Sequence, residues 1–326
     1  MTPIKKASRV SQAKAKTTRT GTGTPDTDPV STASDAGQTT TDPSTGMTIH
    51  IPIIDSLIST THQLNYWSNV TASVDGMLGG FPQVSRIDIQ SSRNFIRKLQ
   101  RLDPRTTTPA SQTSAVNATA GKQEEKYLFQ HCLEPGAGIG RVTLNLLAPL
   151  CARLDIIEPI PKFSAVLTSP DSTVVRSGQI RRVYNLPLQE WTPDSEPSWT
   201  APEPDSAPEH DPRNAVENVT GQQRYDLIFN QWVLAHLSQP SLVSYLTSLV
   251  PLLLPGAWII VKENVSSDAF GNDMYDAEDS CVTRGEASWR AAFEAARLRV
   301  FRTELQTGFP RDLKLLPVRM WALRPM

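Results

Sequence analysis

The stretch of sequence that decides the fold is YLFQHCLEPGAGIGR, residues 127–141. It contains an apolar segment that ends at Leu133, an acid at Glu134, a glycine-rich turn and a helix start at Ile139. Glycine adopts positive φ without strain and lets a ligand approach the backbone, and the first turn of a helix presents N–H groups without an intrahelical partner. The stretch therefore predicts a strand, a turn and a helix that together bind a ligand. The alternative is a turn that only caps the helix.

The spacing of the glycines indicates which kind of ligand to expect. Gly136, Gly138 and Gly140 form a G-x-G-x-G series two residues after Glu134. A dinucleotide-binding turn has the spacing G-x-G-x-x-G, which would need a glycine where this chain has Arg141. A nicotinamide-dependent dehydrogenase is therefore disfavoured. The E-x-G-x-G-x-G series resembles motif I of the class I S-adenosylmethionine (SAM) methyltransferases.

Composition argues against several classes of protein. The 326 residues carry a formal net charge of -1, so no overall field attracts nucleic acid or a membrane. No apolar run approaches the roughly 18 residues of a membrane span, and the polar N-terminus shows no secretory signal. The three cysteines, Cys132, Cys151 and Cys281, lack a C-x-x-C spacing. We predict that they are reduced, with Cys132 and Cys151 in the core, and that they hold no zinc.

Changes in composition divide the chain. Residues 1–46 are rich in Thr, Ser, Asp and Pro and are predicted to be a disordered tail, because they cannot bury a core. Their basic, acid-poor start is also compatible with a transit peptide or a nuclear signal. Residues 47–326 are predicted to form one domain, with an N-terminal cap at 47–102 and flexible insertions at 103–125 and 193–223.

Strands and helices alternate along this domain, which then ends in two strands. Strands are expected at residues 127–133, 153–158, 180–184, 225–230, 257–262, 300–306 and 315–323. Helices are expected at residues 85–99, 142–150, 163–168, 240–254 and 286–297. Pro255-Gly256 is expected to stop the fourth of these helices. The order predicts an α/β fold, a doubly wound sheet with helices on both faces.

Polar and glycine positions follow the predicted strands. Besides the glycine turn, these are Glu158, Leu188-Gln189, Gln231-Trp232 and Asn264. Ligands of doubly wound sheets bind beyond the carboxyl ends of the strands, where the strand order reverses. We therefore expect these five positions to meet on one rim of the domain.

Six stretches, in order along the chain, resemble one family. They are YWSNVTASVDGMLGGF (66–81), IDIQSSRNF (87–95), LEPGAGIGR (133–141), LQEWTP (188–193), NQWVLAHL (230–237) and KENV (262–265). They are similar to the protein α-N-terminal methyltransferases, which methylate the terminal amine of proteins that begin X-Pro-Lys or X-Pro-Arg once Met is removed. The match extends from about Tyr66 to Arg324. It departs from the family at residues 313–321, which lack the tyrosine offered to the substrate, and at Glu158, where Asp is common.

The resemblance implies a class I methyltransferase, with a Rossmann-like, doubly wound sheet of seven strands, a terminal antiparallel strand pair and an N-terminal helical cap. It implies SAM as the cofactor and protein N-termini of the X-Pro-Lys/Arg type as substrates, ribosomal proteins among them. We expect a monomer located in the cytoplasm, with the nucleus as an additional location. We expect no metal, no nucleic acid and no membrane as partner.

Seven residues are expected to hold the cofactor: Gly136, Gly138, Arg141, Glu158, Leu188, Gln189 and Gln231. The glycines bring the backbone close, the Glu158 carboxylate can accept protons from both ribose hydroxyls, and Arg141 can pair with the methionyl carboxylate. The resemblance places Leu188 and Gln189 beside the adenine and Gln231 beside the methionyl part. The alternatives are a solvated strand-end acid for Glu158 and a surface helix residue for Arg141.

The expected catalytic residues are Asp279, His236 and Asn264. The substrate amine must be neutral to attack a methyl group, and a free α-amino group has a pKa of about 7.7–8.0. A nearby carboxylate or imidazole can take its proton. His236 titrates near neutrality and suits this role, although a structural hydrogen-bonding histidine is the alternative. The resemblance assigns Asn264 and Asp279 to the amine.

The residues expected to bind the substrate are Trp67, Leu78, Val84, Trp232 and Asp276. Trp232 and His236 are four apart, which would put both on one side of a helical turn. An indole ring suits a proline or a cationic amine, although a core position is the alternative. Asp276 lies with Asp273, Glu278 and Asp279 in an acidic segment, which is either an exposed loop or a mouth for a basic third residue. The resemblance assigns Asp276 to that cation, and Trp67, Leu78 and Val84 to the cap over the peptide.

Two other functions stay open. One is a class I methyltransferase of another amine or of a small molecule, against which the acidic segment argues because it suits a cationic protein terminus. The other is a Rossmann-like binding module without activity. The presence of Gly136, Gly138, Glu158 and Asp279 together argues against that module.

Overall fold

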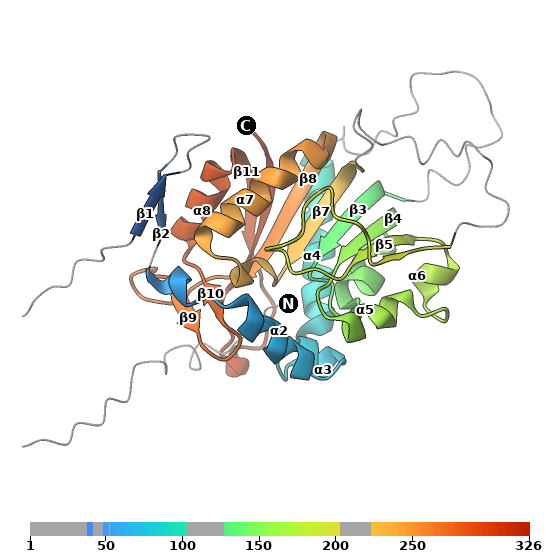
Figure 1. Cartoon of the computed structure of the whole chain (residues 1–326), viewed down its shortest axis with the longest axis horizontal. Helices are drawn as coiled ribbons and strands as arrows, with labels where there is room; N and C mark the ends of the chain where they lie inside the picture. The colour runs from blue at the N-terminus through green and yellow to red at the C-terminus, as the bar shows by residue number, and fades with distance from the viewer. Residues whose placement is uncertain (1–37, 42–47, 52, 103–126, 203–222) are drawn as a thin grey trace, which may run out of the picture.

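The computed structural model describes residues 38–41, 48–51, 53–102, 127–202 and 223–326. Its main element is an eight-stranded sheet in the order β11-β12-β8-β7-β3-β4-β5-β6 (Figure 1). The strands are β3 (Phe129–Pro135), β4 (Cys151–Ile157), β5 (Ile180–Tyr184), β6 (Trp199–Thr200), β7 (Tyr225–Gln231), β8 (Leu253–Asn264), β11 (Leu298–Leu305) and β12 (Val318–Pro325). The five central strands, β3, β4, β5, β7 and β8, are parallel, whereas β12 runs antiparallel to both β8 and β11.

Helices cover both faces of this sheet (Figure 1). They are α2 (Thr60–Asn69), α3 (Val74–Met77), α4 (Ser85–Leu102), α5 (Pro161–Thr168), α6 (Thr173–Arg176), α7 (Gln239–Leu249) and α8 (Glu286–Ala295). Helices α7 and α8 pack on one face, against strand residues such as Leu133 and Ile259. Helix α4 and residues of α5 and α6 pack on the other, against neighbours such as Cys132 and Ile260. The central strands are apolar on both faces, which confirms the doubly wound sheet expected from the sequence.

The reversal of strand order lies between β3 and β7. From β3 the chain continues outward to β4 and β5, and from β7 it continues in the other direction to β8. The carboxyl end of β3 leads into the glycine turn, and the carboxyl end of β7 is Gln231. The rim at this point is therefore where a doubly wound sheet binds its ligand.

The N-terminal cap reaches the same rim. Helix α2 begins after Ser59, whose Oγ accepts a hydrogen bond from the backbone N–H of His62. It lies beside the ribbon of β9 (Met274–Asp276) and β10 (Cys281–Thr283) (Figure 1). Short 3₁₀ segments at Ile53–Leu57 and Pro82–Val84 complete the cap. Helix α4, expected at residues 85–99, is confirmed and is three residues longer.

Two boundaries differ from those expected. Strand β6, an eighth strand, pairs with β5 inside the segment 193–223 that we predicted to be a flexible insertion. A ribbon of β1 (Gln38–Thr41) and β2 (Thr48–Ile51) crosses the boundary expected at residue 46. The rest of the predicted tail (1–37 and 42–46), the predicted insertion at 103–125 and residues 203–222 lie outside the described residues.

Two helix predictions are also wrong in detail. The helix expected at residues 142–150 contains a π-helical turn at Thr143–Leu147, where the N–H of Ala148 donates to the carbonyl of Thr143. Helix α7 ends at Leu249, followed by a 3₁₀ turn at Val250–Leu252, because Pro251 cannot continue the ladder. Pro255-Gly256 therefore lies within the exposed start of β8 instead of stopping the helix.

The prediction of three reduced cysteines is wrong for two of them. Cys132 and Cys151 form a disulfide, with their Cα atoms 6.3 Å apart. They lie on the neighbouring parallel strands β3 and β4, and both side chains belong to the sheet face covered by α4. They are 19 positions apart in the sequence, and the pairing of β3 with β4 brings them together. Cys281 is not part of this disulfide and is buried.

Phe95 tests how much the packing of α4 contributes to stability. Its side chain is buried under the sheet, whereas Leu102 on the same helix is 53% exposed. Phe95→Ala should lower the free energy of unfolding by about 3–5 kcal/mol, because it leaves a cavity. Leu102→Ala should change it by no more than about 0.5 kcal/mol. Urea unfolding measures both, and equal effects would contradict the packing of α4 described above.

Candidate active site

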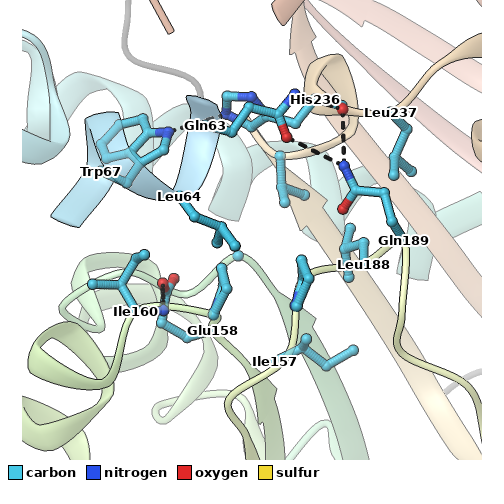
Figure 2. A pocket seen from close by; sticks show the side chains of 14 residues that line it. Gln63, Leu64, Trp67, Ile157, Glu158, Ile160, Leu188, Gln189, His236 and Leu237 are labelled. Atoms are coloured by element: carbon cyan, nitrogen blue, oxygen red, sulfur yellow. Dashed lines mark hydrogen bonds between the residues drawn. The ribbon is translucent and has the colours of Figure 1, made fainter. Parts of the chain in front are cut away.

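A pocket opens at the rim between the carboxyl ends of β3, β4 and β7 and helix α2. Figure 2 shows apolar side chains around its lower part, including Ile157, Ile160 and Leu188, with Leu64 of α2 reaching between them and the upper part. Polar side chains line the upper part: Gln63, Trp67, Gln189 and His236. Gly136 and Glu158 also line the pocket, so four of the seven expected cofactor residues meet here: Gly136, Glu158, Leu188 and Gln189.

Glu158 holds the glycine turn. It follows β4 and is buried, and its Oε2 accepts a hydrogen bond of 2.7 Å from the N–H of Gly138. Its Oε1 accepts a second, of 2.9 Å, from the N–H of Ile160. Burial raises the pKa of Glu158, and the two N–H groups oppose that rise. The solvated strand-end acid that we kept as an alternative is therefore wrong. A carboxylate has room for further donors, such as ribose hydroxyls.

The glycine turn is too tight for side chains. Gly136 and Gly138 have φ values of 69° and 57°, in the left-handed region. A Cβ on Gly136 would lie 2.6 Å from the Cβ of Val233, which follows β7. The turn from β3 is thus pressed against the segment after β7, as expected at a switch point.

Arg141 belongs to a buried ionic cluster centred on Asp88 of α4. The Arg141 Nη1 lies 2.7 Å from Asp88 Oδ2, and the Lys262 Nζ lies 2.5 Å from Asp88 Oδ1. The amide of Gln231 donates to Asp88 Oδ2 over 2.9 Å. Arg141 is 3% exposed, so the alternative of a surface helix residue is wrong. Arg141 and Gln231 share a partner but are absent from the lining of the pocket around Glu158.

The segment after β7 is held by the end of β8. Trp232 has a φ of 53°, and its N–H donates to the carbonyl of Lys262 over 3.0 Å. The next two N–H groups, of Val233 and Leu234, both donate to Glu263 Oε1 over 2.8 Å. Burial raises the pKa of Glu263 to about 7. These three bonds stabilise a backbone conformation that tryptophan rarely adopts.

Trp232 and His236 do not share one side of a helical turn, which corrects the prediction. Trp232 packs in a buried cluster with Leu78 and Val84, and only Leu234–His236 form a 3₁₀ turn. The His236 ring lies instead beside Trp67, whose indole Nε1 donates to His236 Nε2 over 3.3 Å (Figure 2). The predicted peptide cap is thereby divided: Trp67 lines the pocket, whereas Leu78 and Val84 cover Trp232.

The β9–β10 ribbon carries the acidic segment. Asp276 ends β9 and is half-buried, with Oδ1 accepting from the N–H of Glu278. Asp279 is buried in the turn, and Asp273 Oδ1 accepts from the N–H of Gly285, before α8. The alternative of an exposed acidic loop therefore applies to only part of this segment. Asn264, the last residue of β8, is also buried.

Helix α2 ties this ribbon to the pocket. The amide of Gln63 donates to the carbonyl of Ser280 over 2.7 Å and to the carbonyl of His236 over 2.9 Å. Gln189 donates to the same His236 carbonyl over 3.1 Å. The acidic turn, His236 and the pocket thus belong to one connected structure, although the chain brings them from three distant segments.

The sequence reasoning missed four residues of this rim: Gln63, Asp88, Lys262 and Glu263. Lys262 and Glu263 stand at the end of an otherwise apolar strand, and charged residues are rarely buried there without partners. That signal could have identified them as buried and paired. Asp88 lies within the family-like stretch at residues 87–95, but nothing in the local pattern shows that it is buried, and nothing marks Gln63.

The residues present suit SAM. The pocket offers apolar surface for an adenine and a buried carboxylate, Glu158, for ribose hydroxyls. Among the described residues, the buried Arg141 Nε and Nη2 have no hydrogen-bond acceptor and Gln231 Oε1 has no donor. A cofactor with a carboxylate and an ammonium group would supply both.

The fold and this rim define a class I SAM-dependent methyltransferase. A solved SAM-dependent methyltransferase of Leishmania major has the same fold, with a TM-score of 0.60 at 24% identity over 91% of this chain and 100% of that one. The sequence matches the family described as AdoMet dependent proline di-methyltransferase over residues 55–201 and 206–324. The chain belongs to this family, whose cofactor is SAM, and both expectations are confirmed.

Curated relatives agree with this placement. The alpha N-terminal protein methyltransferase 1 of Schizosaccharomyces pombe is 33% identical over 264 residues, 80% of this chain and 94% of that protein. Its counterpart in Drosophila melanogaster is 34% identical over 265 residues, 80% and 74% of the two chains. The N-terminal Xaa-Pro-Lys N-methyltransferase 1-B of Xenopus laevis is 33% identical over 250 residues, 76% and 88% of the two chains.

The described residues contain neither a membrane-spanning helix nor a cluster of metal ligands. No helix in that part of the chain is long and apolar enough to cross a membrane. No group of three or more His, Cys, Asp or Glu side chains there could hold a metal ion.

Glu134 allows a test of the electrostatics of the rim. Burial raises the pKa of Glu134 from 4.5 to about 8, although Thr143 Oγ1 donates to its Oε2. A folded-state pKa above the unfolded value means that its contribution to stability is lost as pH rises from about 4.5 to about 8. Glu134→Gln should remove this loss and be more stable than the wild type near pH 9 by roughly 1–4 kcal/mol.

The measurement is urea unfolding of both proteins between about pH 5 and pH 9. The exposed Glu190→Gln is the matched control, and its stability should follow that of the wild type at every pH. Parallel curves for Glu134→Gln and wild type would mean that Glu134 does not titrate in this range.

Proposed function

We propose that the protein methylates the α-amino group of proteins that begin X-Pro-Lys or X-Pro-Arg after removal of Met. The observation that carries this proposal is the connection of two acids to the cofactor pocket. Asp276 and Asp279 lie on one ribbon, and Gln63 links that ribbon to the segment that ends at His236. A terminus with an ammonium group and a basic third residue is complementary to such acids. The names of the relatives support the same substrate class.

The chain's own residues have two tasks in this reaction. When bound, the cofactor supplies a sulfonium methyl group, which transfers in line to a neutral nitrogen. The protein must therefore hold the amine in place and take the proton that it loses. We assign the holding of the amine to Asn264 and Asp279, and the acceptance of the proton to Asp279.

His236 is less suited to be the main base. Its Nε2 accepts a hydrogen bond from Trp67, and a neutral imidazole that accepts there carries its proton on Nδ1. It could take a proton only by giving up the bond to Trp67. We therefore propose that His236 chiefly positions Trp67 and the pocket, with a secondary role as a base.

Trp232 is proposed to form the wall for the proline at position two, supported from behind by Leu78 and Val84. The guanidinium carbon of Arg141 lies 5.4 Å from the centre of the Trp232 ring, so this wall adjoins the proposed cofactor residues. Three further predictions remain: the protein is a monomer, it is located in the cytoplasm and also in the nucleus, and ribosomal proteins are among its substrates.

The assignment of the base predicts how two variants will behave. Asp279→Asn keeps the shape of the side chain but removes the charge, so turnover of an X-Pro-Lys peptide should fall by about 10²–10⁴-fold. The turnover of His236→Gln should fall less, since Asp279 remains as the base. Transfer of radiolabelled methyl from SAM to the peptide measures the turnover of both variants, and calorimetry should show that Asp279→Asn keeps its affinity for SAM. Wild-type turnover in both variants would show that the proposed amine site is wrong.

The assignment of the third-residue site makes a separate prediction. Asp276→Asn should raise KM for X-Pro-Lys peptides and leave kcat close to wild type, because an ion pair made equally in ground and transition states affects binding alone. For an X-Pro-Gln peptide the variant and the wild type should have the same KM. If the variant discriminates between the two peptides as well as the wild type does, Asp276 does not recognise the cation.

A further inference from the structure

The centre of the buried ionic cluster is a residue to which the reaction itself assigns no role. Asp88 belongs to α4 in the N-terminal cap, and its side chain is fully buried. One of its oxygens, Oδ2, accepts from both Arg141 (2.7 Å) and Gln231 (2.9 Å). The other lies 2.5 Å from the Nζ of Lys262. A helix of the cap therefore holds the two side chains that we assigned to the cofactor.

The charges of this cluster do not balance. It contains one carboxylate, Asp88, and two cations, Arg141 and Lys262. Lys262 is satisfied within it, because its Nζ also donates to Ser92 Oγ over 2.8 Å and to the carbonyl of Asp88 over 3.0 Å. One positive charge thus remains without a buried counter-charge in the cluster, and a buried charge is stable only when it is paired.

The remaining polar atoms indicate what completes the cluster. With Nη1 bound to Asp88, the other edge of the Arg141 guanidinium presents Nε and Nη2, and neither has an acceptor in the part of the chain that the structure describes. That edge is the geometry with which arginine binds a carboxylate through two parallel bonds. The Gln231 Oε1, held by the same Asp88 oxygen through its amide, lacks a donor among those residues. Two donors and one acceptor match the carboxylate and ammonium of an α-amino acid group.

We propose that Asp88 is a positioning residue for the amino-acid end of the cofactor, acting through Arg141 and Gln231, with Lys262 as its counter-cation. Asp88 orients both the donor edge of Arg141 and the acceptor of Gln231. Because Lys262 is also present, the cluster has one excess positive charge, which suits the carboxylate of the ligand. The proposal rests on the cofactor roles given to Arg141 and Gln231 above, and is independent of the peptide specificity.

Two ligands that differ only in the amino-acid end test this proposal. S-adenosylhomocysteine carries that end, whereas 5′-methylthioadenosine keeps the adenosine and lacks it. Asp88→Asn keeps the shape of the side chain and removes its charge. Calorimetry should show S-adenosylhomocysteine binding weakened by at least about tenfold, since the lost interaction involves charged, buried partners. The affinity for 5′-methylthioadenosine should stay within about twofold of wild type, because the pocket around Glu158 is unchanged.

Asp155→Asn is the matched control. Asp155 is also buried and paired with an arginine, with Oδ2 2.9 Å from Arg181 Nη2 and 2.9 Å from the hydroxyl of Tyr225. These three residues belong to β4, β5 and β7, and none of them lines the pocket around Glu158. The control should lower the melting temperature, as Asp88→Asn does, but keep the ratio of the two ligand affinities at the wild-type value.

Several results would overturn the proposal. An equal loss for both ligands in Asp88→Asn would show a general structural role, and no loss for either would show no role. A wild-type protein that binds the two ligands equally well would show that the amino-acid end is not held by this cluster. If Asp88→Asn fails to fold, Asp88→Glu provides the same comparison, because the longer side chain keeps the charge but displaces Arg141. We expect Asp88→Glu to bind S-adenosylhomocysteine more weakly than the wild type does and to keep its affinity for 5′-methylthioadenosine.

Discussion

One buried carboxylate, that of Asp88, connects parts of the chain that are far apart in sequence. It binds Arg141 after the glycine turn, Gln231 at the end of β7 and Lys262 at the end of β8. Arg141 follows β3, Gln231 ends β7 and Lys262 lies two residues before the end of β8, so the cluster sets how the cap lies on the carboxyl rim. Removing the Asp88 carboxylate would leave two buried cations, Arg141 and Lys262, without the counter-charge that pairs with both.

The loops of the rim are held in the same manner by acids from the strand ends. Glu158 accepts from the backbone of Gly138 and Ile160, and Glu263 accepts from the two N–H groups after Trp232. Burial raises the pKa of each of these acids, so the rim is electrostatically costly. These hydrogen bonds fix the backbone positions of the loops, and a reaction that depends on alignment requires such fixed positions.

The rim also joins the two halves of the proposed chemistry. Gln63 and Gln189 both donate to the carbonyl of His236, so α2 and the upper wall of the pocket are both bound to one atom of the segment after β7 (Figure 2). Through Ser280, Gln63 extends this link to the ribbon that carries Asp276 and Asp279. The pocket and the acids proposed to bind the substrate are therefore coupled through α2, and a displacement of this helix would affect both.

The sequence by itself determined the alternation of strands and helices, the glycine turn, and the five positions at the carboxyl ends of the strands, because each depends on local pattern and on short spacings. The six stretches also determined the family. Only the tertiary structure decided the rest. That Asp88 and Gln63 reach the rim, that Trp232 faces Leu78 while His236 faces Trp67, and that Cys132 meets Cys151 all depend on contacts between distant segments. Such contacts follow from how the layers pack, and no periodicity within one segment encodes them.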